Sequence, residues 1–172
     1  MLHLRQRRGA TPTVDCSIGY NPSARRKSIT RRAAPALLAL TFVLMLLWSW
    51  DKWPGPLGDT GRELYIPWQI NEGQALYRDI AYFNGPLSPY INAAFFRLFG
   101  VSLRTLVLSN LVILALILFL LYRLLESISG WIAATAAGLA FVSVFAFGQL
   151  VQVGNYNYVC PYSHEFTHGI LL

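Results

Sequence analysis

Apolar residues are concentrated in three long runs, and polar residues fill the segments between them. The runs cover residues 33–50, 104–123 and 131–153. An apolar stretch of roughly 18 residues or more can cross a bilayer as a helix. The pattern therefore predicts an all-α integral membrane protein with three transmembrane helices and an outer loop that carries short amphipathic helices.

The polar segments predict how this membrane domain, residues 33–172, is oriented. Residues 1–32 hold eight of the fourteen Lys and Arg and show no apolar period, so we expect a disordered basic tail. Basic flanks stay in the cytoplasm. We therefore expect a multi-pass plasma (inner) membrane protein with a cytoplasmic N-terminus, an outer loop at 51–103 and a second outer segment at 154–172.

The outer loop contains two predicted helices. A capping residue, Asp59 or Thr60, begins the first helix, which ends near Glu72. The second covers residues 87–99 and is ended by Gly100. Its apolar residues recur at three- and four-residue spacing, which is typical of an amphipathic helix lying in the membrane interface.

Composition changes the picture in two ways. The chain is 55% hydrophobic and only 13% charged, whereas charged residues make up about a quarter of a soluble domain. The net charge of +6 comes from the basic tail, because the rest of the chain is nearly balanced. The bilayer is therefore the expected partner, and nucleic acid is not. Cys16 and Cys160 are expected on opposite sides of the membrane, where they cannot pair.

The first candidate for chemistry is the group Asp59, Arg62 and Glu63. Spacings of three and four residues place these side chains on one helical face. A carboxylate beside a guanidinium stays ionised and can act as a general base or hold a divalent metal. A helix cap with a surface ion pair is the alternative interpretation.

The second candidate is His164-Glu165-Phe166-Thr167-His168, which matches the H-E-x-x-H pattern of zinc peptidases. His164 and His168 would share a helical face and bind Zn²⁺, with Glu165 as the general base. A third protein ligand is expected farther along the chain, since the only other histidine, His3, lies across the membrane. A membrane zinc metallopeptidase is therefore the second functional hypothesis.

Several stretches of the outer loop resemble the first outer loop of GT-C glycosyltransferases, the polytopic enzymes that use polyprenyl-phosphate sugars. They include the protein O-mannosyltransferases and the lipid A aminoarabinose transferase. The stretches are Asp59-Thr60-Gly61-Arg62-Glu63, Gly73-Gln74-Ala75-Leu76-Tyr77-Arg78-Asp79, Asn84-Gly85-Pro86-Leu87-Ser88-Pro89-Tyr90 and Phe96-Arg97-Leu98-Phe99-Gly100. The resemblance spans residues 35–172 and is strongest over 59–100.

The resemblance implies transfer of a sugar from a polyprenyl-phosphate donor on the outer membrane face. Asp59 matches the family's acidic residue, a catalytic base or metal ligand, and Glu63 is the next carboxylate. We expect substrate contacts from Arg62, Tyr77 and Arg78. Asn155 and Tyr156 also suit contacts with a sugar or head group, and an interfacial aromatic belt explains them almost as well. The family has more spans, so we expect this chain to be the N-terminal part of a longer protein. A non-catalytic membrane remnant is the third hypothesis.

The predicted orientation can be tested in intact cells. A membrane-impermeant thiol reagent should leave Cys16 unmodified and reach Cys160, because only the second thiol is expected outside. Modification of Cys16 from the outside would refute the cytoplasmic N-terminus.

Overall fold

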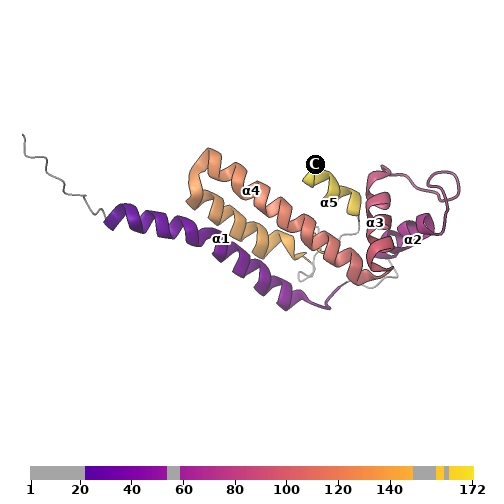
Figure 1. The fold of residues 1–172 in the computed structure, drawn as a ribbon, viewed down its shortest axis with the longest axis horizontal. Helices are drawn as coiled ribbons and strands as arrows, with labels where there is room; N and C mark the ends of the chain where they lie inside the picture. Colours follow the sequence, from indigo (N-terminus) through magenta and orange to yellow (C-terminus); the bar gives the residue numbers. More distant parts are fainter. Residues whose placement is uncertain (1–21, 54–58, 149–157, 161–162) are drawn as a thin grey trace, which may run out of the picture.

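The computed structural model describes residues 22–53, 59–148, 158–160 and 163–172. Its elements are α1 (Pro22–Ser49), α2 (Asp59–Asn71), α3 (Leu87–Phe99), α4 (Leu103–Ala140), the π-helix η1 (Phe141–Ala146) and α5 (His164–Leu171) (Figure 1). No strand occurs in these residues, where one isolated bridge pairs Leu76 with Ile80. The all-α prediction is confirmed.

Helix α1 begins well before the predicted first span. It starts at Pro22, and proline suits a first helical turn because its missing N–H needs no partner there. The Arg, Lys and Ala residues that follow are good helix formers. The disordered tail is therefore wrong for residues 22–32, while residues 1–21 lie outside the described part. Pro35 consequently lies inside α1, where it removes one backbone hydrogen bond.

One described stretch is long and apolar enough to cross a membrane, namely Leu103–Ala146, with 44 residues. The apolar part of α1, Ala33–Ser49, is a shorter helix. The predicted span at 104–123 and residues 131–146 of the predicted span at 131–153 fall together in this stretch, because helical geometry resumes directly after Gly130. Residues 149–153 of the second prediction lie outside the described part of the chain. The described residues thus support one candidate membrane helix and do not support three separate spans.

The long stretch folds back on itself at Gly130, whose φ of 82° and ψ of 169° are not helical. The two arms of α4 lie side by side in Figure 1. A Cβ added to Gly138 on the return arm would lie 3.6 Å from Leu118 of the outgoing arm and 2.9 Å from Leu38 of α1. A small residue such as Gly138 lets another helix approach closely, and α1 makes that approach.

The main core lies between α1, the two arms of α4 and the segment 158–160. Its fully buried members include Val107, Leu114, Val142 and Val159. At the opposite end of α1, Arg31 forms a 3.0 Å ion pair with Glu126 near the turn of α4. An exposed pair of this kind contributes little to stability, so the packing of apolar side chains holds the three helical segments together.

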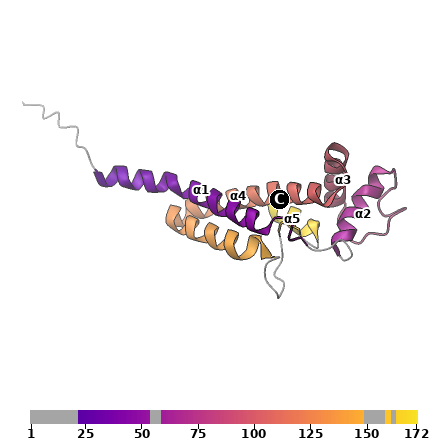
Figure 2. The same ribbon diagram turned by 90° about the horizontal axis from the view of Figure 1, so that it is seen from below.

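The outer-loop helices α2 and α3 pack on each other beyond one end of the α1–α4 bundle (Figure 2). Their bounds agree with the predicted helices, and α2 continues through Pro67 without dividing. Part of the predicted apolar stripe of α3 is exposed, since Leu98 is 73% and Phe99 70% exposed. The buried face instead carries Asn92, at 0% exposure.

The turn of α4 gives a stability prediction. Gly130→Ala should lower the free energy of unfolding by about 1–3 kcal/mol, because its backbone conformation is open to glycine alone. The added methyl would meet nothing within 4 Å, so backbone strain is the whole effect. Gly85→Ala is the control: it has equal space and no positive φ. Thermal unfolding in detergent should distinguish the two variants. Equal losses of stability in both would contradict backbone strain at position 130.

Candidate functional site

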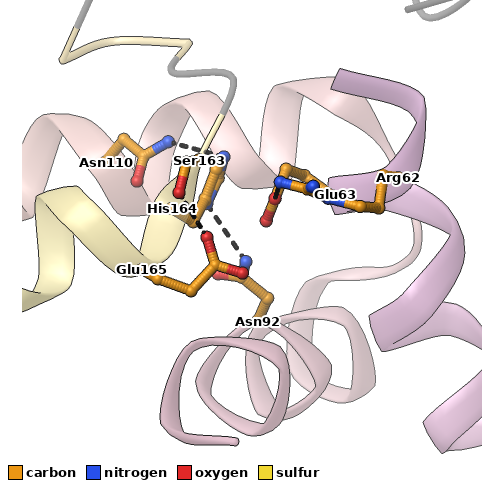
Figure 3. A network of polar contacts seen from close by, with 7 residues as sticks. All are labelled: Arg62, Glu63, Asn92, Asn110, Ser163, His164 and Glu165. Atoms are coloured by element: carbon orange, nitrogen blue, oxygen red, sulfur yellow. Dashed lines mark hydrogen bonds and ion pairs between the residues drawn. The ribbon is translucent and has the colours of Figure 1, made fainter. Parts of the chain in front are cut away.

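Helix α5 lies against α3 and α4, and its first turn reaches α2 (Figures 2 and 3). Segments far apart in the sequence thereby meet around the imidazole of His164, which is 0% exposed. We call this group of side chains the polar junction. Its members are Arg62, Glu63, Asn92, Asn110, Ser163, His164 and Glu165 (Figure 3).

The imidazole of His164 is held between two amides. Asn92 Nδ2 lies 3.0 Å from Nδ1, and Asn110 Nδ2 lies 3.3 Å from Nε2. A neutral ring carries one N–H and one lone pair, so it can accept a hydrogen bond from one of the two Nδ2 groups. Asn110 Nδ2 also donates to the backbone carbonyl of Val159 at 3.3 Å. Burial lowers the pKa of His164 to about 3, and the charges of His168 and Arg62 add to this effect. His164 is therefore neutral near pH 7.

Glu63 is the buried carboxylate of the junction, at 4% exposure. Its Oε1 accepts a hydrogen bond from Arg62 Nη2 at 3.0 Å, and the backbone N–H of His164 also donates to the carboxylate. Burial raises the pKa of Glu63 to about 7, and the Glu165 carboxylate adds to the rise, whereas Arg62 opposes it. A carboxyl group with this pKa can give or take a proton near neutral pH.

Two further side chains of α5 have unused hydrogen-bonding capacity. Glu165 Oε2 accepts from Ser163 Oγ at 2.6 Å, whereas its buried Oε1 has no partner among the described residues. His168 is 4% exposed, and both of its ring nitrogens lack a partner in the same set. Burial lowers the pKa of His168.

The arrangement of the predicted zinc ligands can be compared with a metal site. The rings of His164 and His168 lie edge to face with centroids 6.0 Å apart. Both ring nitrogens of His164 contact amides, so a metal ion there would have to displace Asn92 or Asn110. In the part of the chain that the structure describes, no three His, Cys, Asp or Glu side chains form a group that could hold a metal. The zinc site stays a prediction.

An open cleft of about 620 Å³ lies beside α2, between this helix and the loop that follows it. Its lining includes Arg62, Tyr65, Gln74, Asp79, Phe83 and Asn84. Phe83 is 98% exposed and Tyr65 is 51% exposed. Arg62 belongs to both features, because it lines the cleft and also donates to Glu63. The cleft and the polar junction are therefore joined through one guanidinium group.

The predicted substrate residues Tyr77 and Arg78 shape the wall of this cleft. Tyr77 has a φ of 67°, and its hydroxyl donates to the backbone carbonyl of Asn84. Arg78 pairs with Asp79 at 2.8 Å and lowers the pKa of that carboxyl to about 2. Asn84 and Asp79 line the cleft, so both predicted residues act on it through a neighbour.

The remaining predicted residues are placed less fully. Asp59 is the first residue of α2, but its side chain lies outside the described part. Its place in the chain is two positions before Gly61, which lines the cleft. Asn155 and Tyr156 also lie outside the described residues. A catalytic role for Asp59 therefore stays a prediction.

The two amides that hold His164 are functional candidates that the sequence reasoning missed. Asn92 lies off the apolar stripe of the predicted helix 87–99, so periodicity does not single it out. Asn110 lies inside an apolar run, and a polar residue there is a signal for a partner within the protein. That signal could have singled out Asn110, whereas Asn92 has no comparable signal.

No protein-family model matches this chain, and neither a curated protein nor a solved structure matches it. The geometry of the described residues and the resemblance of the outer loop are therefore the basis for a function.

The contacts of Asn92 and Asn110 with the His164 ring, here called the clamp, predict an effect on stability. Asn92→Ala should lower the free energy of unfolding by about 1–3 kcal/mol, because it leaves a ring nitrogen buried without a partner. Asn84→Ala is the matched control, since Asn84 is exposed and only its backbone is bonded to Tyr77. Thermal unfolding of both variants in one detergent compares them. A loss for Asn92→Ala no larger than the control would rule out the clamp.

Proposed function

We propose that this chain forms part of a membrane glycosyltransferase, which moves a sugar from a polyprenyl-phosphate donor to an acceptor on the outer membrane face. One observation carries the proposal: Arg62 lines an open cleft beside the helix that Asp59 begins. A guanidinium binds phosphate through paired hydrogen bonds. A carboxylate less than one helical turn away can accept the proton of an acceptor hydroxyl.

The two carboxylates of α2 take different roles in this proposal. Glu63 is 4% exposed and bonded to both Arg62 and the start of α5, so an acceptor in the cleft has little access to it. We assign Glu63 to positioning the guanidinium, and we assign the base to Asp59. Exposed rings of Tyr65 and Phe83 supply apolar surface for a sugar, as in other ligand clefts that combine apolar walls with few polar groups.

The membrane arrangement belongs to the same proposal. α1 and the two arms of α4 would cross the bilayer, which gives a multi-pass inner-membrane protein with its N-terminus in the cytoplasm. Large apolar side chains on these elements face outward, for example Leu47, Val112 and Ile132, which are 60–68% exposed. The cleft, α3 and α5 would then lie at the outer surface.

The metallopeptidase is supported less well. It requires His164 to release at least one amide, and Glu165 to turn from Ser163 toward a metal-bound water. No observation favours the non-catalytic remnant, although it would share the same fold. Zinc binding by the parent protein that is lost in His168→Ala would support the metallopeptidase hypothesis.

The glycosyltransferase proposal is tested by transfer from a polyprenyl-phosphate sugar in liposomes. Asp59→Asn keeps a helix-capping side chain, so stability should change by less than about 1 kcal/mol. Loss of the general base should lower the rate by about 10²–10⁴-fold. Glu63→Gln should lower it less, because the amide oxygen can still accept from Arg62.

Glu72→Gln is the matched control for these variants. Glu72 is exposed and directly follows α2, and among the described residues its side chain accepts from Trp68 Nε1 alone. The rate of this variant should therefore equal that of the parent. A parent protein with no transfer activity would overturn the proposal. Full activity in Asp59→Asn with a dead Glu63→Gln would reassign the base to Glu63.

A further inference from the structure

A second groove, separate from the cleft beside α2, lies between α3 and the first turns of α4. It has a volume of about 470 Å³, and none of its lining residues lines the cleft. Apolar walls come from Phe95, Phe99, Leu108 and Val112. The polar lining consists of Ser102, Arg104, Thr105 and Ser109. No acidic residue contributes, so the groove carries a single positive charge.

Arg104 is the polar group of this groove that is available to a ligand. It is exposed and takes part in none of the ion pairs found among the described residues. The hydroxyl groups are already engaged: Ser102 Oγ accepts from the backbone N–H of Thr105 at 3.1 Å, and Thr105 Oγ1 donates to the carbonyl of Gly100 at 2.8 Å. Recognition in the groove therefore depends on the guanidinium charge.

The apolar end of the groove continues along the outside of α4. Leu108 and Val112 are 53% and 60% exposed, and the exposed face extends to Leu116 and Phe119. The rings of Phe95 and Phe99 stack with centroids 6.4 Å apart and form the facing wall. This face belongs to the one described stretch that could cross a membrane, and in a bilayer the groove would open to lipid chains.

We propose that this groove binds one anionic phospholipid, with the phosphate at Arg104 and an acyl chain between the Phe95–Phe99 pair and α4. Arg104 lies in the first turn of the candidate membrane helix, the depth at which arginine meets lipid head groups. A positive groove without a carboxylate prefers a head group with net negative charge. The inference does not depend on the proposed transferase activity.

Native mass spectrometry of the full chain, released from non-ionic detergent, tests this site. With matched acyl chains, phosphatidylglycerol should be retained more strongly than phosphatidylcholine. Arg104→Gln should weaken phosphatidylglycerol binding about fivefold, the effect of removing one basic residue near an anionic head group. Arg123→Gln, at the other end of the predicted second span, should leave the affinity unchanged.

A second variant tests the apolar part of the site. Leu108→Trp places a larger side chain in the groove and should reduce retention of both lipids, with circular dichroism confirming the helical fold. Equal affinities in Arg104→Gln and Arg123→Gln would overturn the proposal, as would equal retention of the two lipids by the parent. The proposal would also be overturned if inorganic phosphate alone displaced the phospholipid. Displacement by polyprenyl phosphate at a tenfold lower concentration than the phospholipid would overturn it as well.

Discussion

The polar end of this protein depends on burying His164 as a neutral ring. A charged imidazolium there would face two amides and lie near Arg62, with no water to solvate it. Neutrality lets α3 and α4 close on the ring from opposite sides. The backbone N–H of the same residue then meets Glu63, which in turn bonds to Arg62. Two hydrogen bonds therefore link the start of α5 to the wall of the cleft.

Much of the fold could be predicted from local pattern. Capping residues, periodicity and Gly100 located α2 and α3, because each helix depends on residues close together in the sequence. The basic segment 22–32 was assigned wrongly, since composition suggested disorder while helix propensity and attachment to an apolar helix favour order. The number of membrane spans also could not be predicted from the pattern of apolar residues. Apolar runs do not show whether helical geometry resumes immediately after a glycine, as it does here.

The candidate site was predicted only in pieces. Spacing drew attention to Arg62 and Glu63 in one motif and to His164 and Glu165 in another, but it gave no reason to join them. The pairs that join the elements bridge 72 positions, from Asn92, and 54 positions, from Asn110. The amides of Asn92 and Asn110 belong to no short catalytic or metal-binding motif. Contacts over such separations depend on tertiary packing, which periodicity cannot show.

These long separations also determine when the junction can form during synthesis. Glu63, Asn92 and Asn110 leave the ribosome well before His164, so their polar groups must stay hydrated or find temporary partners until the last helix arrives. Ordering contacts over such loops costs chain entropy before it returns any stability. The surface of α2, α3 and α4 that receives α5 is thus the latest part of the described fold to mature, and a released chain truncated before residue 164 would keep the helical hairpin but leave its polar end open.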